Sequence, residues 1–450
     1  MIVASSPRVA IKTLGCKLNQ YESEQMREDF EALGFEVVDF QAPADVYVIN
    51  SCTVTHRTDR DTRRLARQAR RREPGSVVIV TGCYAQLQPQ VLKSIDAIDL
   101  VAPNDVKPRI ARLAAERLAQ RRGADVLPVP PQPARPDRLI HSFADHTRAF
   151  VKIQSGCDSR CAYCTIPLAR GPSRSVPREQ VLRQGRLLAG AHREIVLVGV
   201  HVGRYGLDLP PPRSSLVDLV GELCDLPELG RVRLSSIEPR EVTPELIDLV
   251  CAGGNALSAG GEAPGRGKLC RHLHIPLQSG CDATLERMKR PYGRDFCAEL
   301  VRGIAAREPA VSIGADVLVG FPGETDEDFE DTREFVEALP LAYLHVFTYS
   351  ARPGTEAAGM PDQVNPEVRK RRNHVLRKLS EQKARRFAER AVGQTLEVIV
   401  ETPRDETGRL SGISDNYLRV GVEGPDELVG KLVAVEVHGL TGGNLVGRLL

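Results

Sequence analysis

The sequence has no apolar run close to the roughly 20 residues that a membrane-spanning helix needs, so we expect no membrane segment. Its first residues, Met1–Arg8, also lack the apolar core of a secretory signal peptide. The net charge is only +2, which excludes a uniformly basic protein. Because the 11 cysteines come without an export signal, we expect a cytoplasmic protein whose thiols serve metals or chemistry instead of disulfides.

Apolar residues make up 42% of the chain, which is enough for folded domains with hydrophobic cores. The length of 450 residues suggests about three domains of about 150 residues each. The pattern divides the chain into an α/β segment, a proline-rich linker, a second α/β segment, a basic helix and a run of short strands. We place these parts at residues 1–120, 121–148, 149–365, 366–390 and 391–450.

The N-terminal segment alternates predicted strands and helices, which favours an open parallel sheet with helices on both faces. Cys16, Cys52 and Cys83 each follow the carboxyl end of a predicted strand. Open α/β sheets bind ligands at that edge, so we expect the three thiols to converge on an iron–sulfur cluster. Small neighbours such as Gly15 and Gly82 would leave room for it. The competing interpretation is three ordinary buried cysteines. The strands are predicted at Val9–Leu14, Val46–Asn50 and Ser76–Thr81.

The segment 149–365 contains six strand-like runs with helical stretches between them, which predicts a partial (β/α)6 barrel. In such folds the chemistry gathers at the carboxyl ends of the strands. The runs are Ala149–Gln154, Glu194–Val200, Arg231–Ile237, His272–Leu277, Val311–Val319 and Tyr343–Tyr349.

Cys157, Cys161 and Cys164 follow the first of these strands with the spacing C-x₃-C-x₂-C. Three thiolates this close can hold three irons of a [4Fe–4S] cluster, and the fourth iron stays open to the amine and carboxylate of a small molecule. This spacing is the signature of radical S-adenosylmethionine (SAM) chemistry. The main alternative is a zinc site, but structural zinc usually takes four ligands in two separated pairs, and no second pair follows in the sequence.

Other strand ends supply candidate SAM contacts. Gly199 follows the second strand and would allow a ligand to approach the backbone. Glu238 follows the third strand and Gln278 follows the fourth. They are candidates because all of these strand ends are expected at one rim of the barrel. Tyr163 lies between two of the cysteines and is placed to stack on an adenine, with a packing role as the equal alternative.

Positive charge is concentrated in two predicted helices. Arg57–Arg72 carries eight arginines against two aspartates, and Glu367–Arg390 carries ten basic and three acidic residues. This concentration favours a polyanion partner, although most charge runs are simply solvated helical faces. After Gly393, five short strands predict a small β-barrel, an architecture that includes nucleic-acid binders, with a structural cap as the alternative.

Over essentially the whole chain, these motifs resemble the radical SAM methylthiotransferases. The resemblance rests on the two cysteine sets, on a C-terminal barrel similar to TRAM domains, and on the motifs Leu277–Gly280, Gly320–Thr325 and Tyr349–Thr355. Lys-Leu-Asn after Cys16 is similar to the branch that acts on N6-threonylcarbamoyladenosine in tRNA. The branches that act on isopentenyladenosine and on a ribosomal-protein aspartate more typically have Gln-Met-Asn and Pro-Lys-Asn there. The glycine-rich tract 253–268 looks longer than is usual in the family.

The resemblance implies two [4Fe–4S] clusters and SAM as cofactors. The C-x₃-C-x₂-C cysteines would hold the cluster that binds SAM, and the three N-terminal cysteines would hold the second. A 5′-deoxyadenosyl radical would take hydrogen from C2 of the modified adenine next to the anticodon, where a methylthio group is installed. The implied partners are tRNA and an electron donor such as flavodoxin or ferredoxin. Two alternatives stay open: the same chemistry on isopentenyladenosine or a ribosomal protein, and a non-catalytic RNA-binding protein.

Overall fold

The structure is a computed structural model that describes residues 6–123, 138–143, 146–253, 267–401, 404–405 and 407–450. Most of the predicted proline-rich linker and of the glycine-rich tract lies outside the described residues. The chain forms two compact units. Unit 1 consists of residues 1–140 with the short segments Gly156–Asp158 and Thr165–Pro172, and unit 2 contains the remaining residues.

Unit 1 is built on a five-stranded parallel sheet with the strand order β2-β1-β3-β4-β5. The predicted open parallel sheet is therefore confirmed, and the two edge strands, β2 and β5, are additions that the sequence did not suggest. The strands are β1 (Arg8–Thr13), β2 (Glu36–Val38), β3 (Val46–Ser51), β4 (Val77–Gly82) and β5 (Leu100–Ala102). The helices are α1 (Lys17–Ala32), α2 (His56–Arg72), α3 (Cys83–Leu87), α4 (Pro89–Lys93), α5 (Ile110–Arg121) and α6 (Ile166–Arg170).

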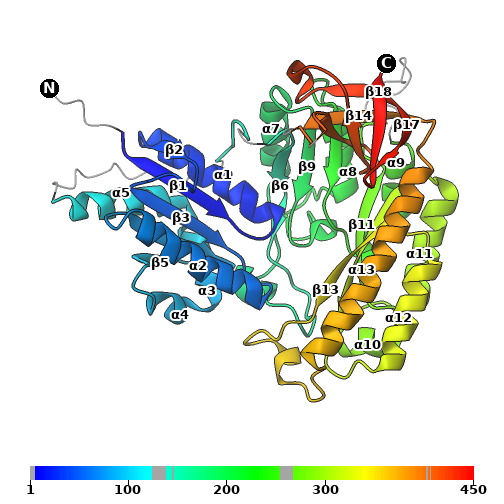
Figure 1. Cartoon of the computed structure of the whole chain (residues 1–450), viewed down its shortest axis with the longest axis horizontal. Coiled ribbons are helices and arrows are strands. Elements are labelled where there is room, and N and C mark those ends of the chain that lie inside the picture. The colour runs from blue at the N-terminus through cyan, green and yellow to red at the C-terminus, as the bar shows by residue number, and fades with distance from the viewer. Residues whose placement is uncertain (1–5, 124–137, 144–145, 254–266, 402–403, 406) are drawn as a thin grey trace. The chain divides into compact units, whose positions relative to one another are not determined.

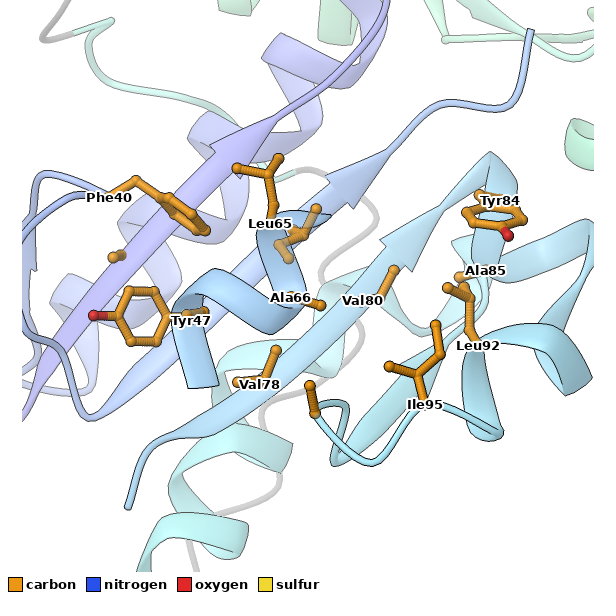
Figure 2. Close-up of a cluster of buried hydrophobic side chains, with 14 of the residues drawn as sticks. Phe40, Tyr47, Leu65, Ala66, Val78, Val80, Tyr84, Ala85, Leu92 and Ile95 are labelled. Atoms are coloured by element: carbon orange, nitrogen blue, oxygen red, sulfur yellow. The ribbon is translucent and has the colours of Figure 1, made fainter. Parts of the chain in front are cut away.

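Helices cover both faces of this sheet. Alternate residues of β3 and β4 point to opposite faces, so each face has its own hydrophobic cluster. Tyr47 and Val80 face α2, α3 and α4 in the cluster that Figure 2 shows. Val48 and Ile79 face the opposite way, against α1 and α5. Every residue of β3 and β4 is buried, as expected for the central strands of a parallel sheet.

Unit 2 contains six parallel strands whose spatial order follows the chain. The strands form two three-stranded sheets, and an isolated parallel bridge between Ser236 and His274 joins the two sheets. All six predicted strands of the partial barrel are thus present. They are β6 (Ala149–Lys152), β9 (Glu194–Val198), β10 (Arg231–Leu234), β11 (His272–Gln278), β12 (Ser312–Val319) and β13 (Tyr343–Thr348). The intervening helices are α7 (Arg178–Ala189), α8 (Leu216–Cys224), α9 (Pro244–Cys251), α10 (Asp282–Arg287), α11 (Arg294–Arg307) and α12 (Asp326–Ala338), and a short pair, β7 (Gln154–Ser155) and β8 (Arg174–Ser175), lies near the cysteine loop.

Helix α13 (Pro366–Glu389) follows the barrel and packs along β13 (Figure 1), where Asn373 Nδ2 donates to Val346 O at 3.0 Å. Part of its predicted surface charge serves the fold instead. Arg372 is buried and pairs with Glu324 at 2.5 Å, and the buried Lys383 donates to two carbonyls at the end of α12. The remaining basic residues of α13 are mostly exposed.

The five predicted C-terminal strands form a closed barrel in the order β14-β15-β16-β18-β17, drawn in orange to red in Figure 1. Closure removes the free strand edges that an open sheet would expose. Among the described residues, no helix combines the length and apolarity needed to cross a membrane. The strands are β14 (Thr395–Glu401), β15 (Leu410–Ser414), β16 (Arg419–Val422), β17 (Leu432–Thr441) and β18 (Asn444–Leu449).

A buried charge network ties this barrel to the six-stranded barrel within unit 2. Glu194 at the start of β9 accepts from Arg231 Nε at 2.6 Å and from Arg233 Nε at 2.8 Å. The outer nitrogens of Arg231 reach the carbonyls of Glu397 and Ile413, at 3.1 and 2.7 Å. Those of Arg233 reach the carbonyls of Ser414, the last residue of β15, and of Asp415, which follows it, both at 2.9 Å. Glu194 and Arg233 are fully buried, and the one carboxylate of Glu194 is the close partner of both cations in this strand.

Candidate functional site

The three N-terminal cysteines lie where the sequence predicted, at the carboxyl edge of the parallel sheet. Cys16 caps α1 after β1, Cys52 directly follows β3, and Cys83 opens α3 directly after β4. Gly15 has φ +94°, and a Cβ atom there would lie 2.8 Å from Cys52 Sγ. The backbone before Cys16 therefore passes directly over the Cys52 thiol.

The electrostatics of these thiols also indicate that they lie together. Burial raises the pKa of the Cys52 thiol to about 11, and the neighbouring Cys83 and Cys16 add to the increase. Thiols that disfavour one another's ionisation fit a metal centre, because bound iron supplies the positive charge that three thiolates need. The donor set is therefore suited to an iron–sulfur cluster.

The glycines beside these cysteines also determine how closely the chain approaches itself. Gly15 and Gly82 were expected to leave room for a bulky cofactor. A Cβ at Gly82, which has φ +96°, would instead lie 2.2 Å from the carbonyl oxygen of Ser51. Both glycines let the chain approach itself closely in a left-handed conformation, and so they shape the edge that carries the cysteines.

A buried cation that sequence reasoning missed lies beside the same thiols. Arg170 of α6 belongs to unit 1 and donates to Glu22 Oε1 at 2.8 Å and to Asn19 Oδ1 at 2.6 Å. Burial opposes its charge, but Glu22 and the nearby Cys83 and Cys16 raise the pKa of Arg170 above its usual value. A buried positive charge therefore lies near two of the three predicted cluster ligands.

The C-x₃-C-x₂-C loop is held by backbone hydrogen bonds. In unit 1, Cys157 N donates to Gly171 O at 3.0 Å. In unit 2, Cys164 N donates to Cys161 O at 3.0 Å, and Ala162 N donates to Met288 O at 3.1 Å. None of the three forms a disulfide within the part of the chain that the structure describes, and Cys157 is buried while the other two are half-buried. The loop thus presents three unoxidised sulfurs, as cluster ligation requires.

Arg290 is the second functional candidate that the sequence did not indicate. Its side chain is only 3% exposed and forms an ion pair with Glu238. Its Nη1 donates to Cys161 Sγ at 3.1 Å and lies 3.4 Å from the hydroxyl of Tyr163. Its Nε donates to the hydroxyl of Tyr292 at 2.8 Å. The predicted SAM contact Glu238 therefore lies in the same network as a predicted cluster ligand.

The other predicted SAM contacts are placed as follows. Tyr163 packs edge-on against Phe321, with ring centroids 6.4 Å apart, which favours the packing role. A Cβ at Gly199 would lie 3.1 Å from Gln154 Oε1, so the close neighbour of this glycine is a side chain of the protein. Gln278 ends β11 with φ +68°, a strained conformation for a residue with a side chain. Such strain often marks a ligand-binding position.

Three neighbouring strands place two histidines and a carboxylate together. Asp316 Oδ1 lies 2.8 Å from His274 Nε2 and 3.6 Å from His345 Nδ1. Burial opposes ionisation, but hydrogen bonds from His274 and His345 outweigh it and lower the pKa of Asp316 to about 2. The same three residues are spaced closely enough to hold a metal ion. Only the alternation in His272-Leu273-His274 hints at this cluster in the sequence.

Helix α2 presents an exposed row of arginines that we call the arginine stripe. Its members follow at intervals of three or four residues and so lie along one helical face. Asp61 Oδ1 lies 3.1 Å from Arg64 Nη2, and Asp61 Oδ2 lies 4.0 Å from Arg57 Nε. For the other three, no acidic partner lies within ion-pairing distance among the residues that the structure describes. The stripe consists of Arg57, Arg60, Arg64, Arg67 and Arg71.

Comparisons with known proteins agree with this geometry. Residues 8–103 match the family described as "Uncharacterized protein family UPF0004", and residues 151–336 match the radical SAM superfamily. Over 435 residues, the chain is 38% identical to the threonylcarbamoyladenosine tRNA methylthiotransferase MtaB of Bacillus subtilis, covering 95% of this chain and 93% of that relative. It is 32% identical over 437 residues to the tRNA-2-methylthio-N(6)-dimethylallyladenosine synthase of Syntrophotalea carbinolica, covering 95% and 96% of the two chains.

Among solved structures, the fold is similar to TsrM, a radical SAM methyltransferase from Kitasatospora setae determined with cobalamin and a [4Fe–4S] cluster bound. The TM-score is 0.54 at 15% identity, and the match covers 89% of this chain and 81% of that one. This likeness concerns the fold alone. The sequence relatives go further: the chain belongs to the radical SAM methylthiotransferase family, which implies SAM and [4Fe–4S] clusters as its cofactors.

Proposed function

We propose that this protein installs a methylthio group at C2 of N6-threonylcarbamoyladenosine next to the anticodon of tRNA. The observation that carries the proposal is the presence of two separate three-cysteine sets, one at the sheet edge of unit 1 and one in the loop after β7. The named substrate of the Bacillus subtilis relative supports the choice of nucleoside.

In this proposal Cys157, Cys161 and Cys164 hold the cluster that binds SAM. When bound, the cluster and SAM supply a radical that removes hydrogen from carbon. Glu238 and Gln278 contact SAM from the ends of β10 and β11. Gly199 and Tyr163 line the same rim, where Tyr163 supports the cysteine loop through its packing against Phe321.

Cys16, Cys52 and Cys83 would hold the second cluster, which would present sulfur for insertion into the nucleoside, and the donor of that sulfur is not assigned. The chain's own contribution is to place the three thiols together at one sheet edge with a cation nearby. Arg170 provides a buried positive charge beside two of them, and Gly15 allows the close approach of the Cys16 backbone to Cys52. An electron donor such as flavodoxin or ferredoxin reduces the SAM-binding cluster.

The phosphate groups of the tRNA contact the arginine stripe. The tRNA also contacts the C-terminal barrel. An RNA backbone carries a regular array of negative charges, and the stripe supplies a matching row with few local acidic partners. The closed five-stranded barrel is of a type that includes nucleic-acid binders.

Iron analysis and product analysis together test the assignment of the two cysteine sets. After anaerobic reconstitution we expect about eight irons per chain, and about four after replacing Cys16, Cys52 and Cys83 with alanine. That triple variant should still cleave SAM to 5′-deoxyadenosine without modifying tRNA. Cys157→Ala should abolish cleavage. Cys224→Ala, which removes a buried thiol of α8 outside both sets, is the matched control and should retain both activities.

Two results would contradict the proposal in different ways. If the protein holds eight irons but forms no 5′-deoxyadenosine with SAM and a strong reductant, it is a non-catalytic RNA-binding protein. If tRNA from a deletion strain keeps its 2-methylthio-N6-threonylcarbamoyladenosine, the substrate is another one. Mass spectrometry of that tRNA would then reveal the loss of the isopentenyladenosine mark, or a ribosomal protein would lack its modification.

A further inference from the structure

Arg290 makes a contact that packing alone does not require. It lies in the loop after α10, where its guanidinium could have faced solvent. Instead its side chain is 3% exposed, and three of its partners are the thiol of Cys161, the carboxylate of Glu238 and the hydroxyl of Tyr292. Its plane also stacks over the Tyr292 ring, with Cζ 4.9 Å from the ring centroid. Each edge of the guanidinium is thereby fixed, and one edge is aimed at sulfur.

A buried cation that donates to a thiolate sulfur acts on the cluster that the thiolate holds. Hydrogen bonds to the sulfurs and the net charge around an iron–sulfur cluster are two of the factors that set its reduction potential. Reduction adds one negative charge, so a nearby positive charge and a donated hydrogen bond stabilise the reduced form. Arg290 should therefore raise the potential of the cluster held by Cys161.

Glu238 should act in the opposite direction, because its carboxylate brings negative charge into the same pocket. The two effects do not cancel, since Coulomb energy falls with distance and only Arg290 touches the sulfur. Glu238 pairs with Nη2 of the guanidinium, whereas Cys161 accepts from Nη1. Its side chain is also 27% exposed, so water screens its charge more than that of Arg290.

We propose that Arg290 is a positioning residue that raises the reduction potential of the SAM-binding cluster through its contact with Cys161, and that Glu238 opposes this effect while holding Arg290 in place. The inference rests on the proposed function, because it takes Cys161 as a cluster ligand. The inference adds that Arg290 and Glu238 set how readily the cluster accepts the electron from its donor.

A purely structural alternative predicts something different. If Arg290 and Glu238 only brace the loops after α10 and β10, removing either partner breaks the same ion pair. Both variants should then shift the potential in the same direction or leave it unchanged. Opposite shifts from the two halves of one ion pair are expected only when charge at the sulfur sets the potential.

The test is a redox titration of the reconstituted full-length protein, followed by electron paramagnetic resonance of the reduced cluster. Iron and sulfide content are measured for every sample. At a fixed solution potential, Arg290→Gln should lower the ratio of reduced to oxidised cluster on the order of tenfold, which is about 59 mV for a one-electron couple. Arg290→Lys keeps the charge without the planar fork and should shift the ratio less. Glu238→Gln should shift the ratio the other way.

Arg287→Gln is the matched control, because it removes a nearby arginine that pairs with Asp328 at 2.7 Å instead of contacting a cysteine. It should leave the midpoint unchanged. An unchanged midpoint in Arg290→Gln at full iron content would overturn this inference and leave the proposed function intact. If Arg290→Gln does not take up iron, Glu238→Gln decides: an unchanged or more negative midpoint overturns the inference. A wild-type protein that binds no iron would overturn both.

Discussion

Replacing Glu194 with glutamine should loosen the C-terminal barrel, because it removes the carboxylate that pairs with the buried guanidinium groups of both Arg231 and Arg233. Burial alone would raise the pKa of Glu194, but Arg231, Arg233 and Arg148 outweigh it and hold the pKa well below its ordinary value. The carboxylate is therefore charged at neutral pH. Glutamine keeps the shape of the side chain and removes the charge.

The expected magnitude follows from the contacts that are lost and retained. Breaking a buried ion pair from one side typically costs about 3–5 kcal/mol. The four hydrogen bonds from Arg231 and Arg233 to backbone carbonyls remain, so we expect a value near the lower end. A loss of about 3 kcal/mol would speed the opening-limited exchange of β14 and β15 amides by roughly a hundredfold.

Hydrogen–deuterium exchange of the intact protein measures this change strand by strand. Glu436→Gln is the control, since its pair with Arg448 is largely exposed and is worth at most about 1 kcal/mol. Because the folded pKa of Glu194 is depressed, its contribution is present above about pH 4.3 and is lost as the pH falls further. The difference between variant and wild type should thus be equal at pH 6 and pH 8. Exchange in Glu194→Gln as slow as in Glu436→Gln would refute the reasoning.

Three further predictions concern the two units separately. Gly15→Ala places a methyl group 2.8 Å from Cys52 Sγ and should reduce bound iron from about eight to about four per chain, while 5′-deoxyadenosine formation continues; full iron content would contradict it. Alanine replacement of the arginine stripe should weaken tRNA binding and flatten its salt dependence, which filter binding at several salt concentrations measures; an unchanged slope would remove the stripe from the RNA interface. Asp316→Asn should lower the thermal midpoint at pH 7, because a pKa of about 2 keeps Asp316 charged there and asparagine removes that charge from beside His274 and His345; an unchanged midpoint would count against this.

The strands that carry the cysteines were predictable because they are short, apolar and buried on both faces. Such runs stand out in a sequence, and a cysteine directly after one is placed at a sheet edge by topology alone. Cys52 and Cys83 are the clearest cases. The ligand roles of all six cysteines stay predictions that iron analysis tests.

The buried arginines could not be found in this way. Arg170 and Arg290 each contact partners more than 100 residues away in the chain, and no local spacing encodes those contacts. Arg231 and Arg233 even contradict the usual pattern, since charged residues in a fully buried strand make sense only once Glu194 is placed opposite them. The role of Gly199 toward a ligand stays a prediction, and the structure adds that Gln154 Oε1 would lie 3.1 Å from a Cβ placed there.

The three-residue length of β2 and β5 affects how the chain behaves before it receives iron. These two strands border the sheet of unit 1 and offer only a few unpaired backbone groups to a passing polypeptide. Long, flat borders invite strand addition from other molecules and the growth of aggregates. A freshly synthesised chain awaiting its metal is thus protected from misassembly by the shortness of its outermost strands.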